Sequence, residues 1–302
     1  MYNEDHKKAY LDTLKPSPGK KNIESFMNCV AEAEESLNKD IAQFTKDELI
    51  SYYSQAEFCN PSYVVEQLKI LRKYRIWYNE NVEHCVISVV SSDLADEIDS
   101  SEAIKKNLFF SLDELIDTLE DLSDIYDLTD ICSYILSWYQ VKLNKSVELK
   151  KTDVRDDGDL VSIHLHDRVL KISHVRAAGL IKKYRDTVVM EREFTANKGD
   201  YEENNSVYFI RSFKKEPSKK AAPVSASAIQ QRRNDRAKMF GISDIDYRNV
   251  MLSGELCMVS DAVKNGFDPK DALRKIHPKF ENNKIEDRYH LYVQFEKAKE
   301  RR

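Results

Sequence analysis

Apolar positions in the first ninety residues recur at helical spacing. Ser17-Pro18 has the form of a helix start, because an N-cap side chain is followed by proline in the first turn. Thr45-Lys46-Asp47-Glu48 has the pattern of a capping box and predicts a second helix. A third helix is expected to begin near Asn60, with an apolar side formed by Val64, Leu68, Leu71, Ile76 and Trp77. The segment is therefore predicted to form a small helical domain.

A change in composition marks a boundary after this helical segment. Residues 88–106 are mainly small, polar and acidic, which is typical of a linker. We expect a first domain over residues 1–88, a linker over 89–106 and a second domain over 107–302. A further capping box, Ser111-Leu112-Asp113-Glu114, opens the second domain, and the apolar segment 131–139 predicts a buried helix.

The pattern changes from helical to alternating after residue 160. Segments 161–165 and 168–172 alternate apolar and polar residues around His166-Asp167, which predicts a tight β-hairpin. Further elements are expected as helices over 174–187 and 225–240, a loop over 196–206, a short strand over 207–210 and a basic, flexible stretch over 214–222. The predicted fold class is mainly α with one small β-sheet.

The composition supports packed domains without a metal or cofactor. The 302 residues are 41% apolar and 33% charged with only 7 Gly and 7 Pro, which excludes collagen-like, low-complexity and wholly disordered chains. The chain has no run of 18 apolar residues and no apolar N-terminal stretch, so we expect no membrane span, no secretory signal and a cytoplasmic protein.

The five cysteines form no C-x-x-C pair and are expected to be buried reduced thiols. His164 and His166 could share one face of a strand, but no third metal ligand is evident.

The net charge of −5 conceals an uneven distribution along the chain. Residues 1–150 contain 28 acidic and 16 basic residues and carry −12, whereas residues 151–302 contain 24 acidic and 31 basic residues and carry +7. A basic C-terminal half favours a polyanionic partner.

The order of these elements resembles the tyrosine recombinase, or phage integrase, family over nearly the whole chain. PSPGKKNIESF and NPSYVVEQLKILRKYRIWY look like helices of the family's core-binding domain, and SYILSWYQVKLNKSVELKKTDV is similar to its first catalytic box. SASAIQQRRNDRAKMFGI resembles the helix that lies in the major groove, and FDPKDALRKIHPKF with EDRYHLYV resembles the box around the last histidine and the nucleophilic tyrosine. The resemblance implies a helical core-binding domain and a mainly helical catalytic-like domain that together clamp duplex DNA.

The family's first catalytic positions are altered in this chain. Family members cleave DNA by attack of a tyrosine on a phosphate, while two arginines and a lysine stabilise the developing charge. Lys142 stands at the position of the first arginine and lacks the bidentate guanidinium fork. The short turn His166-Asp167 leaves only Lys171, on the return strand, near the position of the hairpin lysine.

The second arginine box, with the family pattern H-x-x-R-[HK], is also incomplete. Its nearest match keeps Arg248 but places Ile245 and Asn249 at the acid–base positions, and another register places Glu255 where the arginine belongs.

The last histidine and the nucleophile have better equivalents. His277 fits the histidine, and Tyr289 is the nearest equivalent of the nucleophile, with Tyr292 as an alternative. The resemblance therefore implies a degenerate active site at Lys142, Arg248, His277 and Tyr289, with no strand-cleaving activity.

The resemblance also implies a set of DNA-binding residues. Arg232, Arg233 and Arg236 are expected to contact phosphates and base edges from the major groove, with Gln230 and Gln231 able to read adenine. The other expected contacts are Lys69, Arg72, Lys73, Lys142, Arg168, Lys171, Arg248, His277, Arg288 and Tyr289.

These features predict a sequence-specific double-stranded DNA-binding protein associated with the bacterial nucleoid. The resemblance extends to the integrase-like master repressors of SPβ-type prophages, which implies a transcriptional repressor that maintains lysogeny. Its predicted partner is double-stranded DNA at operator-like sites, and no membrane is expected to bind it. The protein could also associate with itself on DNA or bind an antirepressor peptide or protein. Two alternatives are a divergent active recombinase that uses Tyr289 and an accessory architectural DNA-binding protein.

Overall fold

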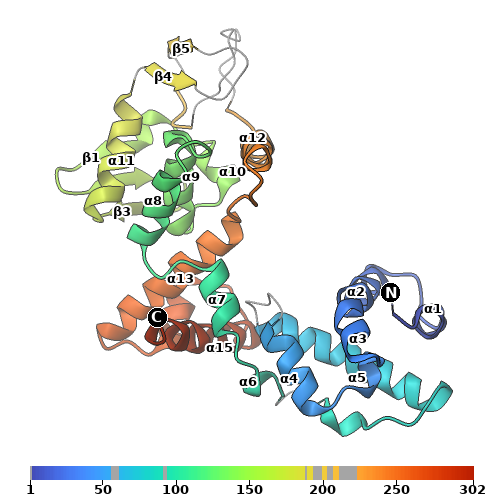
Figure 1. Ribbon diagram of the computed structural model, residues 1–302. Helices are drawn as coiled ribbons and strands as arrows, with labels where there is room; N and C mark the ends of the chain where they lie inside the picture. Colours follow the sequence, from blue (N-terminus) through green and yellow to red (C-terminus); the bar gives the residue numbers. More distant parts are fainter. Residues whose placement is uncertain are drawn as a thin grey trace. The chain divides into compact units, whose positions relative to one another are not determined.

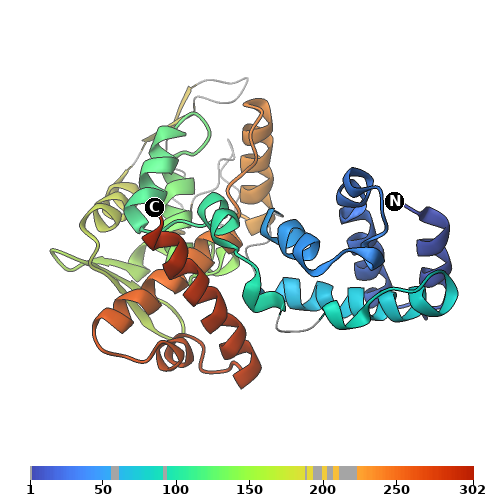
Figure 2. The same cartoon turned by 60° about the horizontal axis from the view of Figure 1, so that its bottom comes forward.

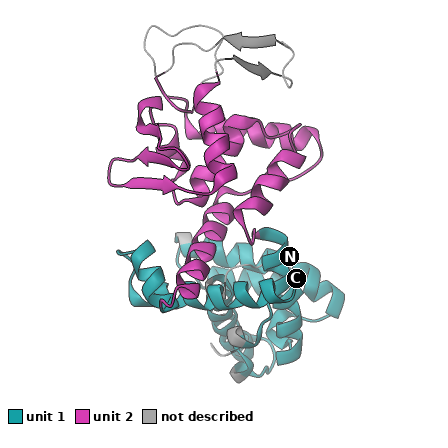
Figure 3. Cartoon of the chain, turned by 90° about the vertical axis from the view of Figure 1, so that its left-hand side faces the viewer, with its two compact units in different colours: residues 1–107, 268–302 teal, residues 108–267 magenta. Residues whose placement is uncertain are grey.

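The computed structural model describes residues 2–55, 61–90, 94–187, 189–192, 199–202, 207–210 and 223–302. The chain divides into two compact units, one of residues 1–107 and 268–302 and the other of residues 108–267 (Figure 3). The described part is mainly helical with one three-stranded antiparallel sheet and one two-stranded pairing, so the predicted fold class is confirmed. None of the helices described could span a lipid bilayer, since none is both long enough and apolar enough.

The first unit is built from helices only. Its N-terminal elements are α1 (Glu4–Asp12), α2 (Pro18–Cys29), α3 (Ala31–Leu37), η1 (Ile41–Gln43), α4 (Lys46–Gln55), α5 (Pro61–Asn81), η2 (Ile87–Val89), α6 (Leu94–Glu97) and α7 (Ser101–Asn107). Its C-terminal elements are α14 (Pro269–Ile276) and α15 (Asn282–Glu300). The long helix α5, light blue in Figure 2, contacts α1, η1, η2 and α6 as well as the C-terminal helix α15, and so links both parts of this unit.

Side-chain caps set the starts of several helices as the sequence predicts. Ser17 Oγ accepts a hydrogen bond from Lys20 N at the start of α2. The capping box before α4 is formed in both directions, because Thr45 N donates to Glu48 Oε2 (2.7 Å) and Glu48 N donates to Thr45 Oγ1 (3.3 Å). These caps satisfy backbone N–H groups that the helices leave unpaired.

Buried charges tie the core of the first unit together. Arg75 on α5 is 1% exposed and donates to the carbonyl oxygens of Ile41, Phe44 and Val86. Lys7 and Glu34 form an ion pair whose side chains are both fully buried. Burial raises the pKa of Glu34 to about 7, although the hydrogen bond from Lys7 acts in the opposite direction. Arg75 therefore faces the core of the unit and not solvent.

The domain division differs from the one that the sequence predicts. Residues 89–107 include α6 and α7, and Leu94, Ile98 and Ile104 of this segment are buried, so it belongs to the first unit and is not a linker. The C-terminal segment also belongs to the first unit, because α15 packs against α7 and α5. The residues of α15 that are buried are Ile285, Leu291, Tyr292, Phe295 and Ala298.

The second unit is built around one buried helix. Its elements are α8 (Leu112–Asp121), α9 (Leu128–Trp138), α10 (Leu143–Ser146), η3 (Lys151–Asp153), β1 (Val154–Asp156), β2 (Val161–His164), β3 (Val169–Ile172), α11 (Val175–Asp186), β4 (Val189–Arg192), β5 (Gly199–Glu202), α12 (Ala226–Met239) and α13 (Tyr247–Lys264). Helix α9 contacts α8, α10, α11 and α13, and all its residues from Thr129 to Trp138 are buried (Figure 1). The buried helix expected over 131–139 is thus confirmed.

The predicted hairpin is present in the small sheet. The strand order is β1-β2-β3, and Ile163 lies opposite Val154 on one side and Leu170 on the other. Leu165 N donates to Arg168 O (2.8 Å), which closes the turn around His166-Asp167. The strand expected over 207–210 is reduced to a bridge between Lys150 and Tyr208, and the stretch expected over 214–222 lies outside the described residues.

The cysteines match their expected state only in part. Cys85 and Cys132 are buried free thiols, but Cys29 is exposed and Cys257 half-buried, and Cys59 lies outside the described residues. Among the described residues, no group of three His, Cys, Asp or Glu side chains could hold a metal ion.

Helices α9 and α13 cross at a glycine. A Cβ atom added at Gly254 would lie 2.0 Å from the carbonyl oxygen of Trp138, a backbone atom that cannot swing away. Gly179 on α11 offers a matched control, since a Cβ there would meet nothing within 4 Å.

We therefore predict that Gly254→Ala lowers the free energy of unfolding by about 1–3 kcal/mol or more, because it forces the two helices apart. Gly179→Ala should leave stability unchanged or raise it by up to about 1 kcal/mol through its higher helix propensity. Urea unfolding followed by circular dichroism measures both. Equal stabilities of the two variants would contradict the close crossing.

Candidate nucleic-acid interface

Helix α12, predicted to enter the major groove, has one buried and one exposed side. Ser225 caps it by accepting a hydrogen bond from Ala228 N (3.2 Å). The buried residues are Ile229, Arg233, Arg236 and Ala237, which recur at helical spacing. Two of the three arginines predicted to contact DNA therefore lie on the side that faces the protein.

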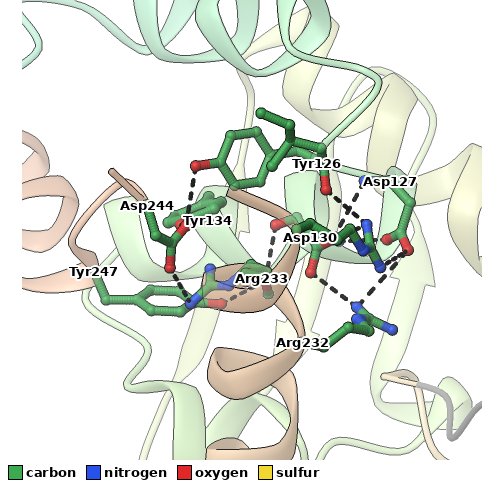
Figure 4. Close-up of polar contacts among 11 residues, drawn as sticks. Tyr126, Asp127, Asp130, Tyr134, Arg232, Arg233, Asp244 and Tyr247 are labelled. Carbon is green, nitrogen blue, oxygen red and sulfur yellow. Dashed lines mark hydrogen bonds and ion pairs between the residues drawn. The ribbon is translucent and has the colours of Figure 1, made fainter. Parts of the chain in front are cut away.

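Arg232 and Arg236 form ion pairs with Asp127 and Asp130, two aspartates at the start of α9 (Figure 4). Arg236 Nη1 donates to Asp130 Oδ2 (3.2 Å) and to the carbonyl oxygen of Ile125 (2.6 Å), and its Nη2 donates to Asp127 Oδ2 (3.1 Å). Arg232 Nη2 donates to Asp130 Oδ1 at 2.9 Å. Asp127 and Asp130 also form the capping box of α9, so the same carboxylates start α9 and hold α12.

The third arginine lies beside two aromatic rings, Tyr134 and Tyr247, which stack on each other with centroids 4.6 Å apart. The guanidinium carbon of Arg233 is 4.5 Å from the ring centroid of Tyr134 and 4.0 Å from that of Tyr247. Its Nη2 lies 3.8 Å from Asp244 Oδ2, and the Arg233 side chain is fully buried. Asp244 in turn accepts hydrogen bonds from the hydroxyls of Tyr126 (3.0 Å) and Tyr134 (3.1 Å).

Burial and the neighbouring charges shift the pKa values of the two aspartates in opposite directions. Burial disfavours the charged form of Asp127, but the charges of Arg232 and Arg236 outweigh it and lower the pKa of Asp127. Burial, together with the neighbouring Asp127 charge, raises the pKa of Asp130. The lowered pKa keeps Asp127 ionised at neutral pH, where its charge pairs with Arg232 and Arg236.

The prediction is thus corrected for Arg233 and Arg236, whereas for the partly exposed Arg232 it stays a prediction. Arg233 is 0% and Arg236 9% exposed, so neither reaches a DNA surface, and Arg232 is held by Asp130. The sequence shows the arginine spacing, but the aspartates that pair with Arg232 and Arg236 lie about a hundred residues earlier in the chain. The sequence signal that was overlooked is the cap Asp127-x-x-Asp130, which places two carboxylates in one turn. Gln230 and Gln231 are exposed, as a DNA-reading role requires.

The basic residues predicted on α5 are exposed. Lys69, Arg72 and Lys73 lie on one side of the helix at spacings of three and four, and Lys69 is paired with Glu66 at 2.6 Å. Ile76, 42% exposed, continues the same side one turn later. This stripe carries the arrangement expected of a helix that meets a phosphate backbone.

A cleft of about 690 Å³ lies beside the hairpin in the second unit. It brings together Lys142, at the start of α10, and Arg168, at the end of the hairpin turn. Its other charged or titratable lining residues are Lys145, Glu148, Asp153, His164, His166 and Asp167, so both signs of charge are present. Lys171 is exposed on β3 and does not line the cleft.

The remaining predicted site residues are divided between the units. Arg248 is exposed at the start of α13 in the second unit, whereas His277, Arg288 and Tyr289 belong to the first unit. The ring of His277 stacks on Phe280 with the centroids 4.1 Å apart.

The two residues that the sequence offers as alternatives for the active site, Tyr292 and Glu255, are buried. Tyr292, the alternative nucleophile, is 8% exposed, and Glu255, the alternative at the arginine position, is 3% exposed. Tyr289 is half-buried, and the Nζ atom of Lys270 lies 4.7 Å from its ring centroid.

Comparisons with known proteins bear on the N-terminal part of the chain. Residues 1–80 match the family model described as the N-terminal core-binding domain of MrpR. The chain is also similar to the crystal structure of XerA recombinase, with 12% sequence identity, a TM-score of 0.37 and coverage of 99% of each chain. No curated protein matches the chain in sequence.

The ion cluster generates a stability prediction. Asp127→Asn keeps an N-cap of nearly equal quality but removes the charge that pairs with Arg232 and Arg236. We expect the free energy of unfolding to fall by about 1.5–3 kcal/mol at neutral pH, as for a lost hydrogen bond to a charged group. Asp235→Asn, an exposed change on α12, should have an effect within about 0.5 kcal/mol.

The effect of Asp127→Asn should also depend on pH. Because the native pKa of Asp127 is lowered from 3.8, its contribution is complete above that value and is lost as the pH falls through the native pKa. The gap between wild type and variant should therefore close in acid. A difference in the free energy of unfolding that grows as the pH falls would contradict a stabilising role for the charge of Asp127.

Proposed function

We propose that this protein is a sequence-specific double-stranded DNA-binding protein that acts as a prophage transcriptional repressor and cleaves no DNA strand. The observation that carries the proposal is the match of residues 1–80 to a core-binding domain, within which α5 exposes Lys69, Arg72 and Lys73. The matching family model is described as a domain of MrpR. The resemblance of the sequence to integrase-like prophage repressors supports the repressor role.

Charge placement supports binding through α5. Each phosphate contact by lysine or arginine releases condensed counterions, so a row of exposed cations adds affinity one contact at a time. Arg75, on the same helix, is buried and bonded to three carbonyl groups, which holds α5 rigidly in place. The basic stripe is thus carried by a firmly anchored helix.

The residues at the family's catalytic positions favour binding over chemistry. Lys142 replaces an arginine, and Ile245 and Asn249 replace acid–base residues. In the cleft, Lys142 and Arg168 share their surroundings with Glu148, Asp153 and Asp167, and these carboxylates oppose the build-up of negative charge on a phosphate. Removal of a single charge-stabilising donor costs about 10²–10³ in rate, so several changes leave no useful catalysis.

The first test is a gel-shift measurement with the full-length protein on phage and host DNA fragments at several salt concentrations. We expect a discrete and reversible shift on a few related fragments, with a log–log salt slope near −0.9 for each phosphate neutralised. Affinity that does not change with salt would rule out the proposed mode of binding.

Substitutions on α5 test the surface directly. Arg72→Ala and Lys73→Ala should each weaken binding to all sequences and reduce the salt slope by about 1, because each removes a phosphate contact. Lys8→Ala serves as the control, since Lys8 is exposed on α1 and paired with Glu4. Unchanged binding by both α5 variants would remove this helix from the interface.

The repressor role differs from that of an accessory architectural protein in its genetic consequence. Deletion of the gene from a lysogen should derepress lytic transcription if the protein is a repressor. Continued silencing after deletion would favour the architectural role.

A further inference from the structure

Three large apolar side chains are exposed within four residues at the end of α12. Met239, Phe240 and Ile242 are 76%, 49% and 39% exposed, and we name residues 239–242 the apolar knob. Exposed apolar side chains that lie close together mark an interaction site, whereas single scattered ones do not. Lys238, directly before the knob, is exposed, and its side chain forms no hydrogen bond or ion pair with any described residue.

The cap of α12 gives the knob a defined backbone. Gly241 has a φ of 70°, the left-handed conformation that is common after the end of a helix. Its N–H group donates to Lys238 O (3.1 Å), and Ile242 N donates to Ala237 O (3.0 Å). The helix itself is fixed by ion pairs with α9. A preformed surface of this kind loses little conformational entropy when it binds a partner.

A groove on the first unit has the matching character. Residues of α3 and α4 line it, and its volume is about 660 Å³. Its apolar lining consists of Ala33, Leu37, Phe44 and Tyr52, and Leu37 is 43% exposed. Glu32, at the same groove, is exposed, and its carboxylate pairs with no residue in the part of the chain that the structure describes.

The two surfaces complement each other in polarity and in charge. The knob offers apolar side chains beside the unpaired cation of Lys238, and the groove offers an apolar lining beside the unpaired carboxylate of Glu32. Burial of the apolar groups would supply affinity, and the opposite charges would fix the orientation. A surface patch that fits a pocket elsewhere on the same molecule joins separate copies head to tail.

From these observations we infer that the apolar knob of one copy of this chain docks in the groove between α3 and α4 of a second copy. The contact is heterologous, because it joins two different surfaces. It goes beyond the proposed function and does not depend on it, since neither the knob nor the groove needs DNA in order to meet its partner.

Sedimentation velocity of the full-length protein without DNA tests the contact. The mean mass of wild type should rise with protein concentration. Phe240→Asp and Leu37→Asp should each stay monomeric, because each would bury an unpaired carboxylate in an apolar contact. Val175→Asp is the control, since it changes an apolar residue of α11 that is 82% exposed, and it should associate as wild type does. All three variants should unfold cooperatively, because the side chains they replace are exposed.

An equimolar mixture of Phe240→Asp and Leu37→Asp tests the pairing of knob with groove. The first variant keeps an intact groove and the second an intact knob, so the mixture should form a heterodimer and no larger species. Charge reversal tests the orientation. Lys238→Glu should weaken self-association by about 5-fold, and Glu32→Lys in the same chain should restore it.

Two results would overturn the inference. One is a wild type that stays monomeric at every concentration. The other is a mixture that stays monomeric although wild type associates, since the knob would then meet a different surface. DNA binding is measured separately by gel shift. Loss of all DNA binding with intact self-association would remove the proposed function and leave this inference standing.

Discussion

The placement of α12 depends on the ion cluster that joins it to α9. Three arginines of one helix meet Asp127, Asp130 and Asp244, and the stacked rings of Tyr134 and Tyr247 lie beside the most deeply buried guanidinium, that of Arg233. A buried charge costs several kcal/mol unless a partner compensates it, so these carboxylates stabilise the orientation of the helix. Two of the three arginines of α12 therefore face the protein and are withdrawn from its exposed side.

This constraint explains where sequence reasoning succeeded and where it failed. The helix caps at Ser17, Thr45 and Ser111 and the hairpin turn at His166-Asp167 depend on residues within a few positions of one another, so their patterns predict them directly. The buried side of α12 depends in large part on Asp127 and Asp130, which lie about a hundred residues away. A spacing of arginines looks the same whether they face DNA or an acidic pair.

The domain boundary and the burial of Arg75 on α5 also depend on contacts between residues that lie apart in the sequence. Segment 89–107 reads as a linker because its few apolar residues are scattered, yet they are buried in the first unit. Arg75 looks like a member of the basic stripe on α5 until its three carbonyl partners, from η1 and from the segments that follow η1 and α5, are known. The exposure of Lys69, Arg72 and Lys73 agrees with the position predicted for them, whereas their contact with DNA stays a prediction.

The central claim is that the protein binds DNA reversibly and forms no covalent bond with it. The most direct measurement is denaturing electrophoresis of the complex that wild type forms with a fragment that it shifts. The account predicts that all DNA is released and that Tyr289→Phe binds as wild type does. A denaturation-resistant adduct that Tyr289→Phe abolishes would contradict the account and identify an active recombinase.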